Sequence, residues 1–278
     1  MSSEEIFVAK LIEDLEAGRL QLPTLPEVAL RVRDAVEDER STVNDIAGII
    51  ATDAAISARL IQVANSPLYR GRDPIDRLPM VVNRLGSRLV RNLVTSQVMK
   101  QMFQATTDYV DQKLRAVWEH SVEVASISRV LASQFSRLQP EQAMLAGLLH
   151  DIGTLPLLYR VEERPEMLER PAVLDHLIRT LHPRVGCAIL EQWKFPDTLV
   201  AVARDHENLS YSHEGPPDLV DVVIVANLQS HVGSDHPLAG VPSEGITAFQ
   251  RLGLDAQVDE IELGLNTEEI GAVQEVLA

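Results

Sequence analysis

The sequence contains a single cysteine, Cys187, and aromatic residues make up only 4% of its 278 positions. One cysteine excludes an intramolecular disulfide and is typical of proteins from a reducing compartment. With so few aromatic rings, a hydrophobic core must consist of Leu, Ile, Val and Ala, and the hydrophobic content of 45% is sufficient for one. Proline and glycine occur at ordinary frequency, which argues against a fibrous or disordered chain.

Positive charge is also scarce, because 25 Lys and Arg residues stand against 41 Asp and Glu residues, a net charge of -16. This excess of negative charge repels nucleic-acid phosphates, so we expect no nucleic-acid partner. No apolar run approaches the roughly 20 residues that a transmembrane helix requires. The first residues, Met1–Glu5, are acidic where a secretory signal would be basic. We therefore expect a cytoplasmic protein with no membrane partner.

Apolar residues recur with helical spacing along nearly the whole chain, and no segment alternates with a period of two. This pattern predicts an all-α fold. The polar stretch 104–111 interrupts it, so we expect two closely packed helical subdomains, an N-terminal bundle over 1–107 and a second helical core over 108–278.

Several residues predict where individual helices begin and end. Thr42 and Asp45 have the spacing of a helix start, and Gly86 predicts a break between two helices. Gly153 is placed as a helix stop, and Pro183 is expected in the first turn of a helix that runs to Trp193.

The residues that carry chemistry are histidines and their acidic neighbours. His150 is followed directly by Asp151, and an imidazole nitrogen with a carboxylate oxygen is a ligand pair for divalent ions. By itself this dipeptide has an equally good structural explanation. His120 could be a half-buried histidine bonded to a backbone carbonyl, and His182 could mark a helix start. Asp205 and its neighbour could form a solvated helix end.

The order of these residues along the chain resembles a known superfamily. It is similar to the HD phosphohydrolases, and especially to their HD-GYP branch. The N-terminal half resembles the HDOD family, the HD-related output domain of bacterial signalling proteins, and the two resemblances together cover roughly residues 20 to 230. The segments that carry them are 118–121 (WEHS), 149–153 (LHDIG), 182–186 (HPRVG) and 205–207 (DHE), and in the N-terminal half 22–28 (LPTLPEV), 46–53 (IAGIIATD), 60–67 (LIQVANSP) and 85–86 (LG).

The resemblance implies a metal pocket between helices and an altered ligand set. Asn227 stands where metal-binding relatives have a closing aspartate, and an amide is a poorer ligand than a carboxylate. The Gly-Tyr-Pro signature of the HD-GYP branch is absent after His206. The resemblance therefore implies a divalent metal ion (Fe, Mn, Mg or Zn) with reduced or lost affinity. The implied ligands are His120, His150, Asp151, His182, Asp205 and His206.

Two functions follow from this resemblance. The first is a signalling output or scaffold module that acts through contacts with signalling proteins or a ligand, and no residue is assigned a catalytic role. The alternative is a metal-dependent phosphohydrolase or phosphodiesterase that acts on a phosphoester or a cyclic nucleotide.

Other polar residues lie outside this pattern. Arg84, Arg88 and Arg91 have spacings of four and three, so one helix face could present them to a partner or to an anionic ligand. The same spacing is typical of a solvated face paired with the abundant acidic residues. A third possible function is a sensor that binds an anionic nucleotide in the altered metal pocket. We expect surface or loop roles for the remaining histidines, His176, His213, His231 and His236.

Overall fold

The computed structural model describes residues 10, 12–14, 17–105, 107–162, 171–254 and 267–277, and within these ranges it contains helices and no strand. The prediction of an all-α fold is therefore confirmed. None of the described helices combines the length and the apolar character needed to cross a bilayer.

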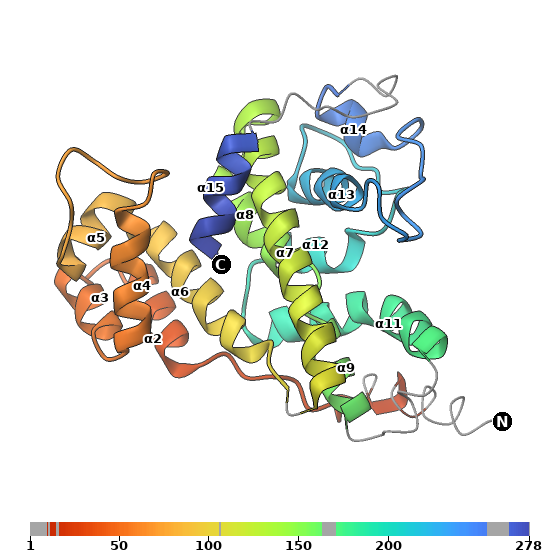
Figure 1. Cartoon of the computed structure of the whole chain (residues 1–278), viewed down its shortest axis with the longest axis horizontal. Coiled ribbons are helices and arrows are strands. Elements are labelled where there is room, and N and C mark those ends of the chain that lie inside the picture. Colours follow the sequence, from red (N-terminus) through yellow and green to blue (C-terminus); the bar gives the residue numbers. More distant parts are fainter. Residues whose placement is uncertain are drawn as a thin grey trace.

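Five helices at one end of the molecule form what we call the N-terminal lobe (Figure 1). Thr42 and Asp45 form a reciprocal capping box at the start of the second of these helices, as their spacing predicts. Gly86 has φ 79° and separates the last two helices, because this left-handed region favours glycine. The helices of this lobe are α2 (Glu27–Glu37), α3 (Val43–Ile50), α4 (Ala54–Ala64), α5 (Leu78–Leu85) and α6 (Ser87–Met102).

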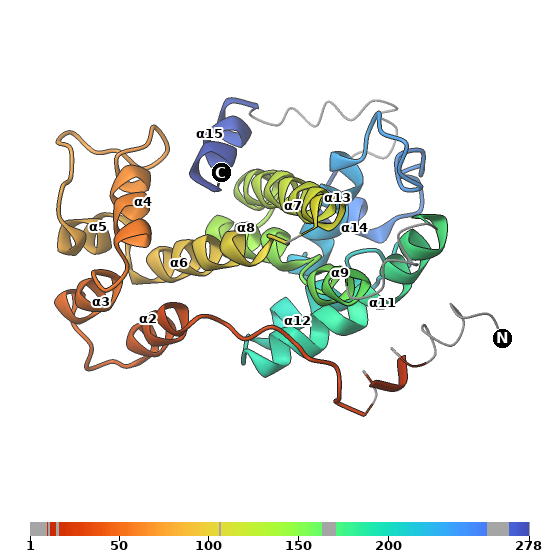
Figure 2. The ribbon, with the colours of Figure 1, turned by 60° about the horizontal axis from the view of Figure 1, so that its bottom comes forward.

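The remaining helices form the C-terminal lobe, arranged around the long helix α7 (Asp108–Phe135), and the last helix, α15 (Thr267–Leu277), lies beside α7 (Figures 1 and 2). Arg129 of α7 is buried and forms ion pairs with Glu141 of α8 and Glu269 of α15, which hold the three helices together. The other helices are α8 (Pro140–Leu149), α9 (Thr154–Glu162), α11 (Pro171–Gln192), α12 (Asp197–Asp205), α13 (Leu219–Ser230) and α14 (Thr247–Arg251).

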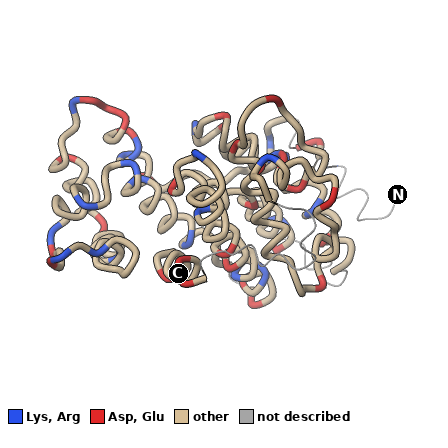
Figure 3. Tube along the Cα trace, turned by 90° about the horizontal axis from the view of Figure 1, so that it is seen from above, with Lys and Arg blue, Asp and Glu red and all other residues tan. Residues whose placement is uncertain are grey.

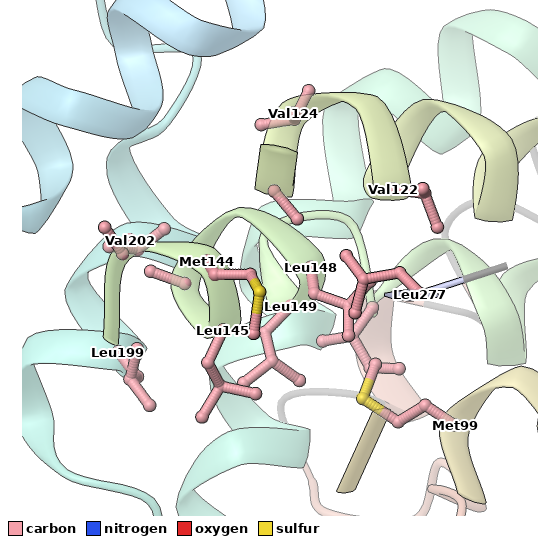
Figure 4. Packing of buried hydrophobic residues seen from close by; sticks show 14 of the residues in the cluster. Met99, Val122, Val124, Met144, Leu145, Leu148, Leu149, Leu199, Val202 and Leu277 are labelled. Atoms are coloured by element: carbon pink, nitrogen blue, oxygen red, sulfur yellow. The ribbon is translucent and has the colours of Figure 1, made fainter. Parts of the chain in front are cut away.

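One continuous hydrophobic core joins the two lobes. Figure 4 shows Met99 of α6 and Leu277 of α15 close to Leu148 of α8. All three side chains are almost fully buried, so the N-terminal lobe, the last helix and the C-terminal lobe share apolar contacts. Each such burial contributes roughly 1.5–3 kcal/mol, so the packing opposes separation of the lobes.

The expected helix start at Pro183 is wrong. α11 runs without interruption from Pro171 to Gln192, and Pro183 lies inside it. Proline removes one backbone donor from the ladder, but the surrounding apolar residues of α11 are buried, and this packing maintains the helix through that position. His182 is therefore a mid-helix residue, and neither a boundary nor a helix start.

Gly153 does end the turn after α8, but the physical reason differs from the expected one. Its φ is not positive, so no left-handed stop is formed. A Cβ at this position would lie 2.0 Å from the carbonyl oxygen of His182 and 2.5 Å from the backbone nitrogen of Gly186. Glycine is required because the turn that carries Asp151 packs directly on the backbone of α11.

This close approach predicts that Gly153→Ala destabilises the protein by roughly 3 kcal/mol or more, because α11 must move away from the turn. Gly48→Ala is the matched control. Gly48 is exposed inside α3 with nothing within 4 Å of the added Cβ, so this change should stabilise the protein by about 0.5–1 kcal/mol. Urea denaturation followed by circular dichroism measures both, and equal effects would contradict the packing argument.

Candidate metal centre

Five of the six implied ligands converge at the centre of the C-terminal lobe. His120 lies midway along α7, while His150 and Asp151 directly follow the last residue of α8. His182 comes from α11 and His206 from the C-terminal cap of α12. His150, His182 and His206 are buried, and Asp151 is only 18% exposed at its side chain. Four chain segments that are distant in sequence thus place their donor groups in one pocket.

The carboxylate of Asp151 lies at the middle of this cluster. Its Oδ1 is 3.3 Å from His182 Nε2 and 3.2 Å from His206 Nε2. Its Oδ2 is 3.5 Å from His150 Nε2 and 3.8 Å from His120 Nε2. The donors therefore form two groups of three that share Asp151, each with its ligand atoms within 4.8 Å of one another.

Backbone carbonyls determine which nitrogen of three imidazoles carries the hydrogen. The Nδ1 atoms of His150, His182 and His206 lie 2.6 Å, 2.9 Å and 3.1 Å from carbonyl oxygens of their own helices. A carbonyl only accepts, so each Nδ1 donates its hydrogen there. The Nε2 atom that faces the pocket then carries a lone pair, as in the metal-binding form of histidine.

This arrangement leaves two lone pairs facing each other. His182 Nε2 and His206 Nε2 are 3.1 Å apart, and both Nδ1 atoms are already donors. A second close pair joins His150 Nε2 and His120 Nε2 at 3.2 Å. Two unprotonated nitrogens at such a distance repel each other unless a cation, a proton or a metal ion, lies between them. The geometry of the pocket therefore requires positive charge.

Burial and the central carboxylate control the protonation of the cluster. Burial lowers the pKa of His150 to about 3 and also lowers the pKa of His120. The pKa of His206 is raised, because the hydrogen bond and the charge of Asp151 outweigh the opposing effect of burial. Burial acts to raise the pKa of Asp151, but the surrounding imidazoles hold it well below its usual range. Asp151 is therefore an anion, and His206 is the imidazole that holds a proton most readily.

Asn227 of α13 lies beside His120 and is buried. Its Oδ1 has no hydrogen-bond partner among the residues that the structure describes. An orphaned buried carbonyl oxygen is costly, and side-chain amide oxygens are ligands of hard divalent cations. The orphaned oxygen and the facing lone pairs therefore both fit a bound divalent ion.

Asp205 is the implied ligand that the structure does not bring into either group. It is the last residue of α12, directly before His206. Asp205 Oδ2 instead lies 2.9 Å from Arg204 Nε, and Oδ1 lies 3.5 Å from Asn208 Nδ2. Asp205 is therefore part of a local ion pair.

The sequence analysis placed His231 and His236 at the surface or in loops, and both do lie in the turns and bends after α13, but it missed their contacts with the pocket. The His231 ring stacks on His120 with centroids 4.7 Å apart, and His236 stacks on His231 at 3.8 Å. Both are half-buried. The spacing could have indicated the first of these contacts, because His231 follows Asn227 by four positions and so shares its helix face.

His213 also forms contacts that the sequence analysis missed. With Asp218 and Asp221 it forms a third group of close donor atoms at the start of α13. Asp218 and Asp221 already accept backbone N–H groups in a reciprocal capping box. His213 Nε2 lies 2.9 Å from Asp221 Oδ2, and this bond raises the pKa of His213. The group is thus a helix cap reinforced by an ion pair.

The three arginines do not share one helix face, because the break at Gly86 separates Arg84 from the other two. Arg84 donates to the carbonyl oxygens of Ala64 at 3.1 Å and Asp73 at 2.6 Å, so it fixes a loop within the N-terminal lobe. Arg88 and Arg91 lie on α6 and line a cavity at the boundary between the lobes.

Residues 22–209 match the family model described as HDOD domain. The chain belongs to the HDOD family. An HDOD domain protein with unknown function from Geobacter sulfurreducens superposes with a TM-score of 0.69 at 23% identity, covering 97% of this chain and 98% of that one, which supports the fold alone.

A second solved structure, described as a "Putative metal-dependent phosphohydrolase" from Shewanella amazonensis SB2B, has a TM-score of 0.79 at 30% identity and covers 100% of both chains. An uncharacterized protein of Treponema pallidum (strain Nichols) is 25% identical over 247 residues, 82% of this chain and 46% of that protein. The HDOD chain therefore spans about half the length of this curated relative.

The buried neutral state of His150 predicts acid sensitivity of the metal-free protein. In the unfolded chain its imidazole gains a proton near pH 6.5, whereas in the fold its pKa is about 3, so unfolding takes up a proton between these values. His150 alone should lower the stability by up to about 1.4 kcal/mol per pH unit as the pH drops below 6.5, and His231, whose pKa burial lowers to about 4, adds to this fall. The raised pKa of His206 opposes the fall only near pH 6.5, because at lower pH His206 is protonated in both states.

Urea denaturation of EDTA-treated protein at pH 7, 6 and 5 measures this slope. His176→Gln, at an exposed position of α11, is the control and should keep the wild-type slope. His150→Gln should have a shallower slope, because it removes the titrating group. Equal slopes for the two variants would contradict the assignment.

Proposed function

We propose that this HDOD chain is a bacterial signal-transduction output module whose HD core binds one divalent metal ion and which acts through protein contacts. One observation carries the metal-binding part of the proposal. His182 Nε2 and His206 Nε2 face each other at 3.1 Å beside the anionic Asp151, and in the metal-free pocket the proton that His206 holds offsets their repulsion. A bound metal ion would replace that proton, and it would be held by Asp151 with the imidazoles on either side.

The donor set favours a first-row transition ion. Four of the five converging groups are imidazoles, which suit Zn²⁺ and Fe²⁺ better than Mg²⁺. The set also favours one ion over two. Asp151 is the one carboxylate in the two donor groups around the pocket, and a second divalent ion would leave most of the added charge uncompensated in a buried space.

The signalling part of the proposal is supported by the positions of the ligands in the fold. His120 and His150 are carried by α7 and α8, and these helices also contact the N-terminal lobe and α15. Asn92 of α6 donates to the carbonyl oxygen of Glu141 at the start of α8. A change in the metal centre would therefore act on the helices that join the lobes, where a partner could detect it.

A phosphohydrolase is the second candidate, favoured by the sharing of Asp151 between two donor groups and by the 30% identity to the Shewanella amazonensis protein. A bound metal ion would lower the pKa of a coordinated water and so supply a nucleophile. Asp151 would hold the ion, since both donor groups share its carboxylate. His120 would be a further ligand, and the ring of His231 stacks on it. Two features oppose turnover, namely the neutral Asn227 and the imidazole stack on His120.

Metal content tests the first part of the proposal. Wild-type protein incubated with Mn²⁺ or Fe²⁺ and then desalted should retain about one equivalent by elemental analysis. Asp151→Asn should lose the ion, because the central charge disappears, and His176→Ala should retain it. Retention by Asp151→Asn at the wild-type level, with its fold verified by circular dichroism, would disprove the proposed site. No retained metal in the wild type would do the same.

Asn227→Asp tests whether the neutral amide weakens metal binding, and turnover by the wild type separates the two candidate functions. A second carboxylate beside His120 should tighten metal binding at least about tenfold, since ~1.4 kcal/mol of added attraction is sufficient. The wild type loaded with Mn²⁺ should leave bis(p-nitrophenyl) phosphate and cyclic dinucleotides intact. Turnover by the wild type that is lost in Asp151→Asn would replace the output-module proposal by the phosphohydrolase.

A further inference from the structure

A cavity of about 370 Å³ lies between the two lobes, away from the metal centre. α2 and α6 of the N-terminal lobe form one side of it, and the start of α8 and the turn between α11 and α12 form the other. We call it the interlobe cleft. Its charged lining residues are Arg33, Arg88, Arg91, Lys194, Glu37 and Glu141.

The interlobe cleft concentrates positive charge in an acidic protein. Acidic and basic residues are interspersed over both lobes (Figure 3), and the whole chain has a net charge of -16. Four of the six charged residues in the cleft are nevertheless cations. Glu141 is already paired with Arg129 at 3.4 Å, which reduces the negative charge available inside the cleft.

Two of the cations lack an acidic partner. Among the described residues, neither Arg88 nor Lys194 lies within ion-pair distance of a carboxylate, whereas Arg91 lies 3.8 Å from Glu37. The pKa of Arg91 is lowered, first by burial and also by the nearby charges of Arg88 and Arg33. Like charges gathered in this way repel each other, and a bound anion would offset that repulsion.

The backbone places Lys194 at the cleft at a conformational cost. The N–H groups of Lys194 and Phe195 donate to the carbonyl oxygens of Glu191 and Leu190, the two bonds of a Schellman motif at the end of α11. Lys194 occupies the left-handed position with φ 56°, where glycine is normal, and no other described non-glycine residue has positive φ. Such strain costs on the order of 1 kcal/mol, and its retention at a cleft indicates a role for the side chain.

The rest of the lining suits an organic group. Leu25, Leu145, Phe195 and Leu199 contribute apolar surface, and Gln139, Gln142, Asn92 and Thr95 contribute uncharged polar groups. The cavity volume falls in the usual range for small-molecule sites, roughly 300–1,000 Å³. A ligand with one anionic part and one planar or apolar part would use both kinds of lining.

We propose that the interlobe cleft binds a phosphorylated small molecule of nucleotide size, with Arg88, Arg91 and Lys194 holding its phosphates. Arginine and lysine are the side chains that recognise phosphate most effectively. Phe195 and Leu25 offer the apolar contact for the remainder of the ligand. This site is separate from the metal centre, and the proposal does not depend on whether a metal is bound there.

Such a ligand would connect the lobes directly. Arg33 Nη1 of α2 donates to the carbonyl oxygen of Trp193 at 2.7 Å, and Trp193 Nε1 donates to the carbonyl oxygen of Pro23 at 2.9 Å. These bonds adjoin the cleft and already link the N-terminal lobe to the turn after α11. A phosphate held by Arg88 from one side and Lys194 from the other would add to these bonds and strengthen the link between the lobes.

Isothermal titration of the full chain with ADP, pyrophosphate and adenosine tests this proposal. ADP should bind in the micromolar range, pyrophosphate more weakly, and adenosine without detectable heat. Arg88→Ala and Lys194→Gly should each weaken ADP binding at least tenfold. Arg31→Ala is the matched control, because Arg31 lies on α2 with a 49% exposed side chain outside the cleft, and it should bind as the wild type does.

A stability measurement on Lys194→Gly and one further variant, Asp151→Asn, make the test decisive. Lys194→Gly removes the strained backbone position, so its melting temperature should equal or exceed that of the wild type, and weakened binding then cannot result from misfolding. Asp151→Asn should bind ADP normally, because the metal centre lies elsewhere. Absence of ADP binding, equal weakening by Arg31→Ala, or loss of binding in Asp151→Asn alone would each overturn the proposal.

Discussion

The contact between the Asp151 carboxylate and four imidazoles is the interaction around which the C-terminal lobe is arranged. The carboxylate is fixed by a turn that only glycine allows to approach α11, and the imidazoles come from α7, α8, α11 and α12. Backbone carbonyls fix three of the rings with their lone pairs inward. A buried anion surrounded by acceptor nitrogens is unfavourable without a cation, so the interior of this lobe is organised around positive charge, which the proton on His206 supplies and a bound metal ion could replace.

The groups around the Asp151 cluster favour metal binding over catalysis. Five donor groups converge, but Asn227 beside them is a neutral amide at the position where the family resemblance implies a carboxylate. The stacked His231 and His236 occupy the space beside His120. A pocket with good donors, one carboxylate and a covered flank is better suited to holding an ion than to exchanging substrate and water around it.

Helix α8 connects the interlobe cleft to the candidate metal centre. α8 carries His150 at its end and lines the cleft at its start, and α6 packs against it across the shared core. The two proposed sites therefore lie at opposite ends of one helix, and they share no lining residue.

The sequence alone determined the helical class, the main helix breaks in the N-terminal lobe and the residue types of the metal pocket, because these depend on local periodicity, capping and ligand chemistry. The break at Gly86 and the capping box at Thr42 follow from such local rules. The family resemblance implied which histidines would meet, but only the packing of distant helices left Asp205 outside the two donor groups and stacked His231 and His236 beside His120. Packing likewise kept α11 continuous through Pro183 and gathered Arg88 with Lys194. These outcomes depend on how helix surfaces fit together across the chain, and no local pattern encodes that fit.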